Sequence, residues 1–290
     1  MPNILVTGSS GQLGSELQEL HQSYPQFSFL FTDRETLDIT DKAAVESTCK
    51  RNNITHIINC AAYTAVDKAE EEQQSADTIN HIAVQYLAEV AAKQHISLIH
   101  ISTDYVFDGT SCTPYIESDA TNPQGIYGKT KLDGENALLR AHPSNSIIIR
   151  TSWVYSSFGN NFVKTMLKLG KERDTLNVVY DQIGTPTYAA DLAMLILDIL
   201  PHIPKETVSI YHYSNEGVCS WYDFTKAIFE FSNISCRVDP IESKEYPTAA
   251  KRPNYGVLNK NKIKNHYNIV IPYWHDSLQR CLKQIEVKKQ

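Results

Sequence analysis

Tyr127 and Lys131 are the two residues of this sequence whose types and spacing are best suited to chemistry. Because they are four residues apart, they would lie on one face of a helix, one above the other. A tyrosine has a reference pKa of about 10 and transfers a proton poorly at neutral pH. A nearby ammonium group favours the phenolate, so we expect Lys131 to lower this pKa. The pair therefore predicts a phenol that gives a proton to a carbonyl oxygen while hydride reaches the carbonyl carbon, although an ordinary exposed helix face would show the same spacing.

A glycine-rich turn lies near the start of the chain. Gly8, Gly11 and Gly14 are three residues apart, directly after an apolar run and at the start of a helical pattern. Side chains at these positions would block the turn or keep an anion away from the backbone amides. The N-terminus of the following helix carries a partial positive charge. The turn predicts a pyrophosphate site, with a tight turn that binds nothing as the alternative.

Asp33 and Arg34 bear on the choice of dinucleotide, because they follow the second apolar run about twenty residues beyond the glycines. An acidic residue at this place bonds the ribose hydroxyls of NAD, whereas an arginine pairs with the 2′-phosphate of NADP. Both residues in tandem leave the choice open. We expect dual use, with NADPH modestly preferred.

Thr103 follows another apolar run, where a strand would reach the carboxyl edge of a sheet. Open α/β sheets bind ligands at this edge. The Thr103 hydroxyl is therefore a candidate to hydrogen-bond a substrate carbonyl and orient it, and an ordinary strand-end turn is the alternative.

Apolar runs and helical patterns alternate through the first half of the chain and would position these residues. The runs predict strands over residues 3–7, 27–31, 56–59, 97–102 and 147–149. The helical patterns cover residues 11–24, 79–93 and 127–140, and another helix is expected to follow a cap at Asp41. Continuous apolar strands separated by helices predict a parallel sheet covered on both faces. The expected fold is a doubly wound, Rossmann-like α/β fold.

The pattern loosens after Arg150, where proline becomes denser. Helices are expected over residues 162–173, 188–200 and 221–231, with short strands such as 208–213 between them. We therefore expect a dinucleotide-binding domain over residues 1–150. Residues 151–290 would form a smaller lobe that mainly binds substrate, with some segments returning to the first domain. The charge run over residues 67–72 is interpreted as the solvated start of a helix.

Composition narrows the class of protein. The 290 residues include 33 acidic and 27 basic side chains, for a net charge of −6, and 42% are hydrophobic. These values exclude wholesale disorder and argue against a general nucleic-acid binder. The sequence contains neither an apolar run long enough to span a membrane nor a signal-peptide pattern. The six cysteines are scattered and the ten histidines show no metal-ligand spacing. We expect a cytoplasmic protein with free thiols and predict no metal site.

Eight segments, in order along the chain, resemble dTDP-4-dehydrorhamnose reductases, a family of the extended short-chain dehydrogenase/reductase superfamily. The segments are residues 11–14, 64–70, 102–107, 127–131, 150–155, 160–162, 181–187 and 252–253. The resemblance implies reduction of the C4 keto group of dTDP-4-dehydro-L-rhamnose by NADPH, with NADH also accepted. This reaction is the last step of dTDP-L-rhamnose synthesis, which supplies cell-surface polysaccharide.

The resemblance also implies roles for individual residues. Thr103, Tyr127 and Lys131 would be catalytic, and Lys131 would also hold the nicotinamide ribose. The sugar nucleotide would contact Thr103, Asp104 and Trp153, with the segment 252–253 near its nucleotide. Further cofactor contacts would fall on Gly11, Gln12, Leu13, Asp33, Asp38, Ile39, Ala62, Tyr63 and Thr64. Only the family resemblance suggests magnesium binding and a homodimer. The sequence itself contains no compact carboxylate cluster that supports them.

Two kinds of alternative stay open. A reductase, epimerase or dehydratase acting on another keto-sugar nucleotide would share the fold, but dehydratases have Thr-Asp-Glu where this chain has Thr-Asp-Tyr at Tyr105. The regulatory subunit of methionine adenosyltransferase resembles these reductases without being an enzyme. Retention of Thr103, Tyr127 and Lys131 together favours catalysis, because a binding module does not need a phenol beside an ammonium group.

Overall fold

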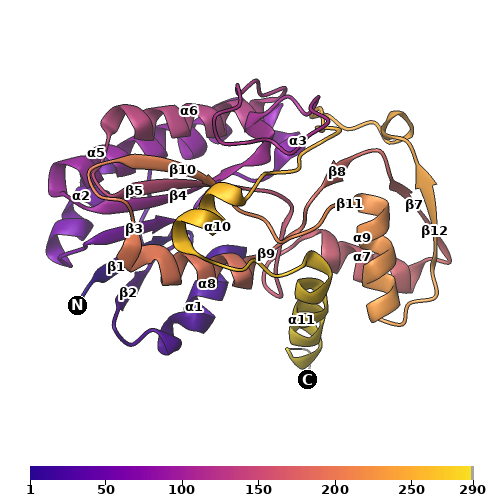
Figure 1. Ribbon diagram of the computed structural model, residues 1–290. Helices are drawn as coiled ribbons and strands as arrows, with labels where there is room; N and C mark the ends of the chain where they lie inside the picture. The colour runs from indigo at the N-terminus through magenta and orange to yellow at the C-terminus, as the bar shows by residue number, and fades with distance from the viewer. Residues whose placement is uncertain (289–290) are drawn as a thin grey trace.

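The computed structural model describes residues 1–288 and has a parallel β-sheet built mainly from the first half of the chain (Figure 1). The sheet has six strands in the order β10-β5-β4-β3-β1-β2, and every neighbouring pair is parallel. The strands are β1 (Asn3–Thr7), β2 (Ser28–Phe31), β3 (His56–Asn59), β4 (Ser97–Thr103), β5 (Ser146–Thr151) and β10 (Val208–His212). The predicted doubly wound α/β fold is confirmed.

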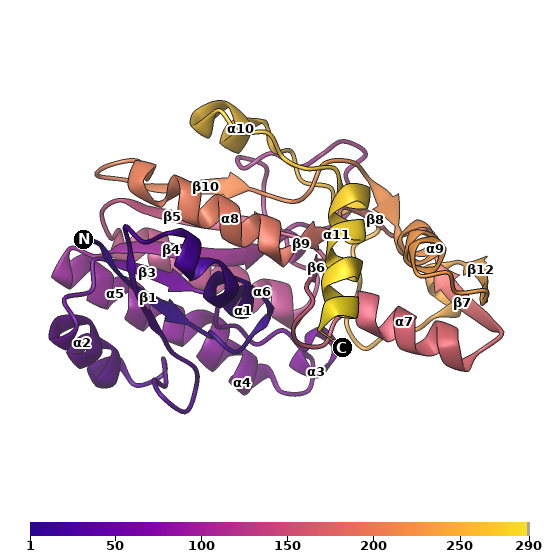
Figure 2. The ribbon, with the colours of Figure 1, turned by 90° about the horizontal axis from the view of Figure 1, so that it is seen from below.

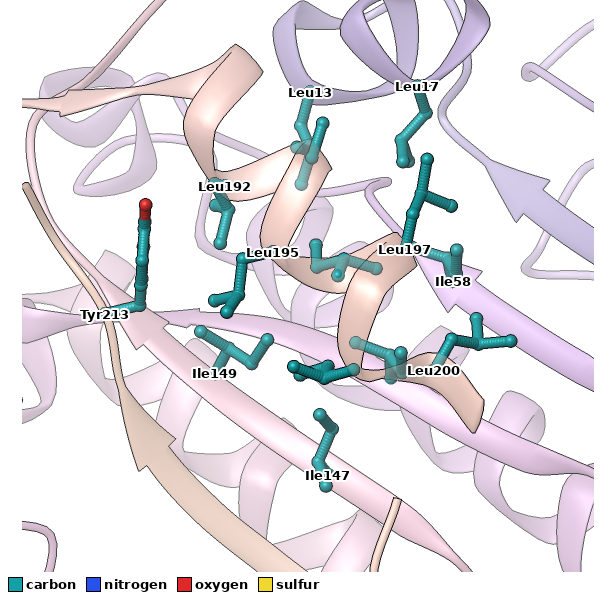
Figure 3. Close-up of a cluster of buried hydrophobic side chains, with 14 of the residues drawn as sticks. Leu13, Leu17, Ile58, Ile147, Ile149, Leu192, Leu195, Leu197, Leu200 and Tyr213 are labelled. Atoms are coloured by element: carbon teal, nitrogen blue, oxygen red, sulfur yellow. The ribbon is translucent and has the colours of Figure 1, made fainter. Parts of the chain in front are cut away.

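Helices cover both faces of this sheet (Figures 1 and 2). One face packs against α1 (Gln12–Leu20) and α8 (Ala189–Ile199), and the other against α2 (Lys42–Arg51), α5 (Ala83–Gln94) and α6 (Ile126–Ala141). Figure 3 shows the first face, where Ile147 and Ile149 of β5 lie under Leu195 of α8. Successive side chains of a strand point to opposite faces of the sheet, so strands that are apolar throughout contribute to the apolar clusters on both faces. No helix among residues 1–288 has the length and hydropathy of a membrane span.

The helix expected over residues 79–93 starts earlier and is not regular. Helix α4 (Gln73–Asp77) continues through a π-helical turn (Thr78–Ile82) into α5. Asn80 lies inside this turn and is completely buried. A π-helical turn re-aims one side chain without ending the helix, and such turns are frequent at functional sites.

The second half of the chain builds a separate apolar cluster. Its helices are α7 (Phe162–Glu172), α9 (Trp221–Phe231) and α11 (Trp274–Val287), and β7 (Thr175–Val179) pairs with β12 (Arg237–Ile241). Short strands and helices complete the chain: β6 (Val154–Tyr155), β8 (Ile183–Gly184), β9 (Thr187–Tyr188), β11 (Cys219–Ser220), α3 (Val66–Ala69) and α10 (Asn261–Tyr267). Strand β10 lies in the main sheet and not with this cluster.

A segment over residues 250–259 returns from the second half to the first. Tyr255 N donates to the Gly109 carbonyl oxygen at 3.2 Å, and Tyr115 N donates to the Val257 carbonyl oxygen at 2.9 Å. Gly256 N donates to the Ile183 carbonyl oxygen at 2.8 Å. This segment, called the return segment below, therefore joins the loop after β4 to β8.

An ion pair is buried between α6 and β5. Glu135 and Arg150 have side chains that are 1% and 4% exposed, and Arg150 Nη2 lies 2.7 Å from Glu135 Oε2. Arg150 Nε and the Ser102 hydroxyl also donate to this carboxylate. Removing one partner of such a pair leaves a buried charge without compensation, so the pair fixes how α6 sits on the sheet.

We therefore expect Glu135→Gln to lower the free energy of unfolding by about 3–5 kcal/mol, because the Arg150 charge would stay buried without a counter-charge. Urea denaturation measures this change. The control is Glu46→Gln, which removes a half-exposed partner of Lys93 and should have a much smaller effect. Equal stability of the two variants would contradict this role for the buried pair.

Candidate active site

The glycine turn lies where the strand order of the sheet reverses. Strand β1 has β2 on one side and β3 on the other, and α/β folds bind ligands in the crevice at this point. Gly8 has a φ of +64°, and a Cβ on it would lie 2.6 Å from Ala61 N. A Cβ on Gly14 would lie 2.5 Å from the Gly8 carbonyl oxygen. These two positions therefore accept only glycine, and the backbone comes close to whatever occupies the crevice.

The N-terminus of α1 opens on this turn. Its N-cap is Gly11, and no side chain caps it. The side chains of the next two residues are engaged elsewhere: Gln12 Oε1 accepts from Asn161 Nδ2 at 2.9 Å, and Leu13 packs in the apolar cluster. Their contribution to a ligand would come from backbone N–H groups at the positive end of the helix. This cradle fits the pyrophosphate of a dinucleotide.

Asp33 and Asp38 both stabilise their own turns. Asp33 Oδ1 accepts from the Thr36 hydroxyl at 2.8 Å and from Thr36 N at 3.1 Å, and these bonds lower the pKa of Asp33. Bonds from the backbone and side chain of Thr40 lower the pKa of Asp38. Arg34 is exposed beside them. Ile39, expected to contact the cofactor, is 7% exposed and belongs to the apolar cluster on the α2, α5 and α6 face of the sheet.

Asn80 was missed by the sequence analysis. Its Oδ1 accepts from Tyr63 N at 2.9 Å, and its Nδ2 donates to the Tyr63 carbonyl oxygen at 3.1 Å and to the Thr130 hydroxyl at 3.2 Å. Asn80 thus joins the loop of Ala62, Tyr63 and Thr64 to the helix that carries Tyr127. A lone asparagine within a helical pattern gives no sign of such contacts in the sequence.

Tyr127 lies in the first turn of α6, next to the end of β4. The N-cap of α6 is Gly125, and Glu70 Oε1 accepts from Ile126 N at 2.9 Å in place of a local cap. Thr103 is the last residue of β4, and its side chain interacts with the Tyr127 phenol, whose ring also meets that of nearby Tyr105. The structure therefore brings the predicted proton donor and the predicted carbonyl-binding hydroxyl together.

The expected lowering of the pKa of Tyr127 is wrong for the protein alone. Burial of the phenol raises its pKa above the ordinary value, and the hydrogen bond from Thr103 opposes this only in part. Removing a phenolate from water costs more free energy than the hydrogen bond from Thr103 restores. Lys131 Nζ donates to the Ile101 carbonyl oxygen at 2.6 Å, so its charge is directed toward the strand.

Lys131 is a buried lysine, 2% exposed. Burial lowers its pKa to about 8, and the carboxylate of Glu135 opposes that change. A lysine with this pKa changes its charge close to physiological pH, whereas an exposed lysine stays charged.

Asp104 follows Thr103 and is 2% exposed. Its Oδ1 accepts from the Thr103 hydroxyl at 3.2 Å, while Oδ2 has no hydrogen-bond partner within residues 1–288. Burial raises the pKa of Asp104 to about 7. A Cβ on Gly256 of the return segment would lie 2.4 Å from Oδ2. The return segment therefore covers this carboxyl group closely.

Trp153 lies at the same edge of the sheet. It is two residues beyond Thr151, which pairs with Thr103 in the register of β4 and β5. Its indole stacks on that of Trp221 with ring centroids 3.5 Å apart and an interplanar angle of 9°. Nothing in the sequence distinguishes Trp221 from an ordinary residue at the start of a helix.

The charge run over residues 67–72 is more than a solvated helix start. Asp67 Oδ2 lies 2.5 Å from Arg252 Nη2, and Asp67 Oδ1 accepts from Ala250 N at 3.1 Å. Arg252 Nη1 also donates to the Tyr105 hydroxyl at 3.2 Å. The Tyr105 ring meets that of Tyr127 edge-on, with centroids 5.5 Å apart. The return segment is thereby anchored beside the predicted proton donor.

One group of metal-ligating side chains lies within residues 1–288: Asp77, His81 and Asp133. His81 Nδ1 is already 2.9 Å from Asp77 Oδ1. Magnesium prefers an all-oxygen set of ligands, whereas this group includes an imidazole nitrogen beside its two carboxylates. The structure gives no support to magnesium binding.

The chain is similar to several known proteins. A family model described as "RmlD substrate binding domain" matches residues 2–287. The chain is 45% identical, over 98% of both sequences, to a protein of Aggregatibacter actinomycetemcomitans named dTDP-4-dehydrorhamnose reductase.

Two solved structures are similar over nearly their whole length. The dTDP-4-dehydrorhamnose reductase of Clostridium acetobutylicum has a TM-score of 0.93 and 41% identity, covering 98% of this chain and 99% of that one. The enzyme of the same name from Bacillus anthracis, in complex with NADP, has a TM-score of 0.92 and 39% identity, covering 98% and 100%. The resemblance inferred from motifs is confirmed, and the chain belongs to the dTDP-4-dehydrorhamnose reductase family.

Proposed function

We propose that this chain reduces the C4 keto group of dTDP-4-dehydro-L-rhamnose to a hydroxyl group with NADPH, giving dTDP-L-rhamnose. The observation that carries the proposal is the meeting of Thr103 with Tyr127 at the carboxyl edge of the sheet, with Lys131 one helical turn further along α6. The glycine cradle lies at the same edge. Membership of the reductase family supports the same reaction.

Each residue has a distinct part in this reaction. The nicotinamide supplies a hydride when it is bound. The Thr103 hydroxyl hydrogen-bonds the keto oxygen and orients the carbonyl group. The Tyr127 phenol donates its proton to that oxygen as the carbonyl carbon becomes tetrahedral. A raised pKa keeps this phenol protonated before the reaction, which suits a proton donor. Lys131 holds the ribose through its ammonium group.

The alternatives are less well supported. A dehydratase needs an acid at the position of Tyr105, and here the Tyr105 hydroxyl instead accepts a bond from Arg252. A non-catalytic binding protein would not need Tyr127 and Lys131 together. The relatives described above carry the name of a reductase.

Further parts of the proposal concern the cofactor, the two halves and the compartment. NADPH is preferred modestly over NADH, since Arg34 is exposed and its planar fork suits a 2′-phosphate. Residues 1–150 bind the dinucleotide, and residues 151–290 mainly bind the sugar nucleotide. The six cysteines are free, as expected for a protein in the reducing cytoplasm.

Tyr127→Phe is expected to lower kcat by orders of magnitude while leaving the fold and NADPH affinity nearly unchanged, because it removes only the phenolic proton donor. Loss of NADPH absorbance with dTDP-4-dehydro-L-rhamnose measures kcat. A control is Tyr86→Phe, which changes a tyrosine on α5. Near-parental turnover in Tyr127→Phe would refute the assignment.

NADPH affinity should fall as the pH rises through about 8, because Lys131 loses its ammonium group there. The sign follows from a pKa below the ordinary 10.5: the lysine is charged below pH 8 and neutral above it. Fluorescence titration with NADPH on both sides of this pH measures the effect. Lys131→Met should abolish this pH dependence, whereas Lys129→Met, on the exposed side of α6, should keep it. A flat profile in the parent protein would contradict the role of Lys131.

Arg34→Ala should weaken NADPH binding by about 1–3 kcal/mol, the range for hydrogen bonds to charged groups, and should leave NADH nearly unaffected. Asp33→Ala should do the reverse, since it removes a ribose contact and a repulsion of the 2′-phosphate. The ratio of kcat/KM for the two cofactors measures both effects. Because Asp33 also stabilises the turn at Thr36, a melting curve must accompany that variant. An unchanged ratio in Arg34→Ala would show that the phosphate is held elsewhere.

A further inference from the structure

Trp221 covers one face of the Trp153 indole. The two rings are nearly parallel, with an interplanar angle of 9°, and their centroids are 3.5 Å apart. This distance leaves no room between the rings for another group. Both side chains are only partly buried, so the pair stands at the border of the site rather than in the apolar core.

Gly184 lies against the opposite face of the same indole. A Cβ on Gly184 would lie 2.7 Å from Trp153 Cε2, 2.8 Å from Cζ2 and 3.0 Å from Nε1. Such similar distances to three bonded atoms place this Cβ over the ring face and not at its edge. Because Trp221 already occupies the other face, the indole lies between Trp221 and Gly184. Gly184 thus covers the Cε2, Cζ2 and Nε1 part of this face, and a ligand would meet mainly the edge of the indole.

The backbone of Trp153 is strained in this arrangement. Its φ is +48°, in the left-handed region that bulky side chains rarely adopt. Strained residues of this kind persist only where the surroundings fix them, and they cluster at functional sites. The neighbouring Ser152 hydroxyl donates to the Thr185 carbonyl oxygen at 2.8 Å, which ties this backbone to the residue after Gly184.

Trp221 is itself fixed by polar and aromatic contacts. Its Nε1 donates to Gln182 Oε1 at 3.2 Å, and Gln182 Nε2 donates to the Ser243 hydroxyl at 3.0 Å. The ring of Phe162 lies 4.5 Å from that of Trp221, at 47°. Trp221 is also the first residue of α9, held by the capping box of Ser220. Contacts with several elements therefore restrict the position of the Trp221 indole.

We propose that Trp221 and Gly184 are positioning residues that hold the Trp153 indole as a rigid wall of the hexose pocket. This inference rests on the function proposed above. The wall presents an indole edge, with apolar C–H groups and the Nε1–H donor, to a nucleotide-linked 6-deoxyhexose. The glycine cradle is formed by α1, β1 and β3, away from this wall. Loss of the wall therefore weakens binding of the sugar nucleotide and not binding of the dinucleotide.

The test compares KM and kcat among variants of the full chain. Trp221→Leu removes the stacked ring and should raise KM for dTDP-4-dehydro-L-rhamnose about three- to tenfold, the range that one aromatic pair provides. KM for NADPH should not change. Trp221→Phe retains a stacking ring and should restore most of the loss. Gly184→Ala leaves Trp221 in place but displaces the Trp153 indole, and should raise the same KM.

A matched control is Phe231→Ala, at the other end of α9, where the ring contacts His275 with centroids 4.5 Å apart. It removes an aromatic ring from the same helix and should leave KM for the sugar nucleotide unchanged. The inference is overturned if cooperatively melting Trp221→Leu or Gly184→Ala retains the parental KM, or if Phe231→Ala raises it equally. If Trp221→Leu does not fold, Gly184→Ala decides. A parent protein that does not oxidise NADPH with this substrate refutes the proposed function instead.

Discussion

The site depends on the parallel pairing of β1, β3, β4 and β5, because this pairing brings their carboxyl ends to one edge of the sheet. The register places Thr103 beside Thr151, and the crevice between β1 and β3 receives the glycine turn. The glycine turn and the proposed proton donor are not neighbours in sequence, since residues 8 and 127 are far apart along the chain. A slip in register would separate them.

Burial controls the proton chemistry at this edge. It raises the pKa of Tyr127 and of Asp104 and lowers that of Lys131, so all three shift toward the neutral form. The Glu135–Arg150 pair adds a compensated charge behind Lys131 and links α6 to β5 without leaving either ion alone.

The sequence predicted what short-range patterns encode. Most strands and helices matched within a few residues, since apolar periodicity and a cap such as Asp41, which accepts from Ala44 N, act locally. The π-helical turn at Asn80 was missed because it depends on contacts with Tyr63 and Thr130. The bond of Asp67 to Arg252 spans 185 residues, and the Trp153–Trp221 stack joins residues 68 positions apart within the second half of the chain. No periodicity reports such long-range contacts, and the rise in the pKa of Tyr127 follows from burial that the sequence could not show.

The most direct test of the proposed reduction is to follow deuterium from C4 of labelled NADPH into the sugar nucleotide. The purified protein is given dTDP-4-dehydro-L-rhamnose and each of the two singly deuterated forms of NADPH, and the product is analysed by mass spectrometry and NMR. The account predicts dTDP-L-rhamnose with one deuterium at C4 of the hexose from one of the two forms only. A product without cofactor deuterium from either form, or a substrate that stays unreduced, would contradict it.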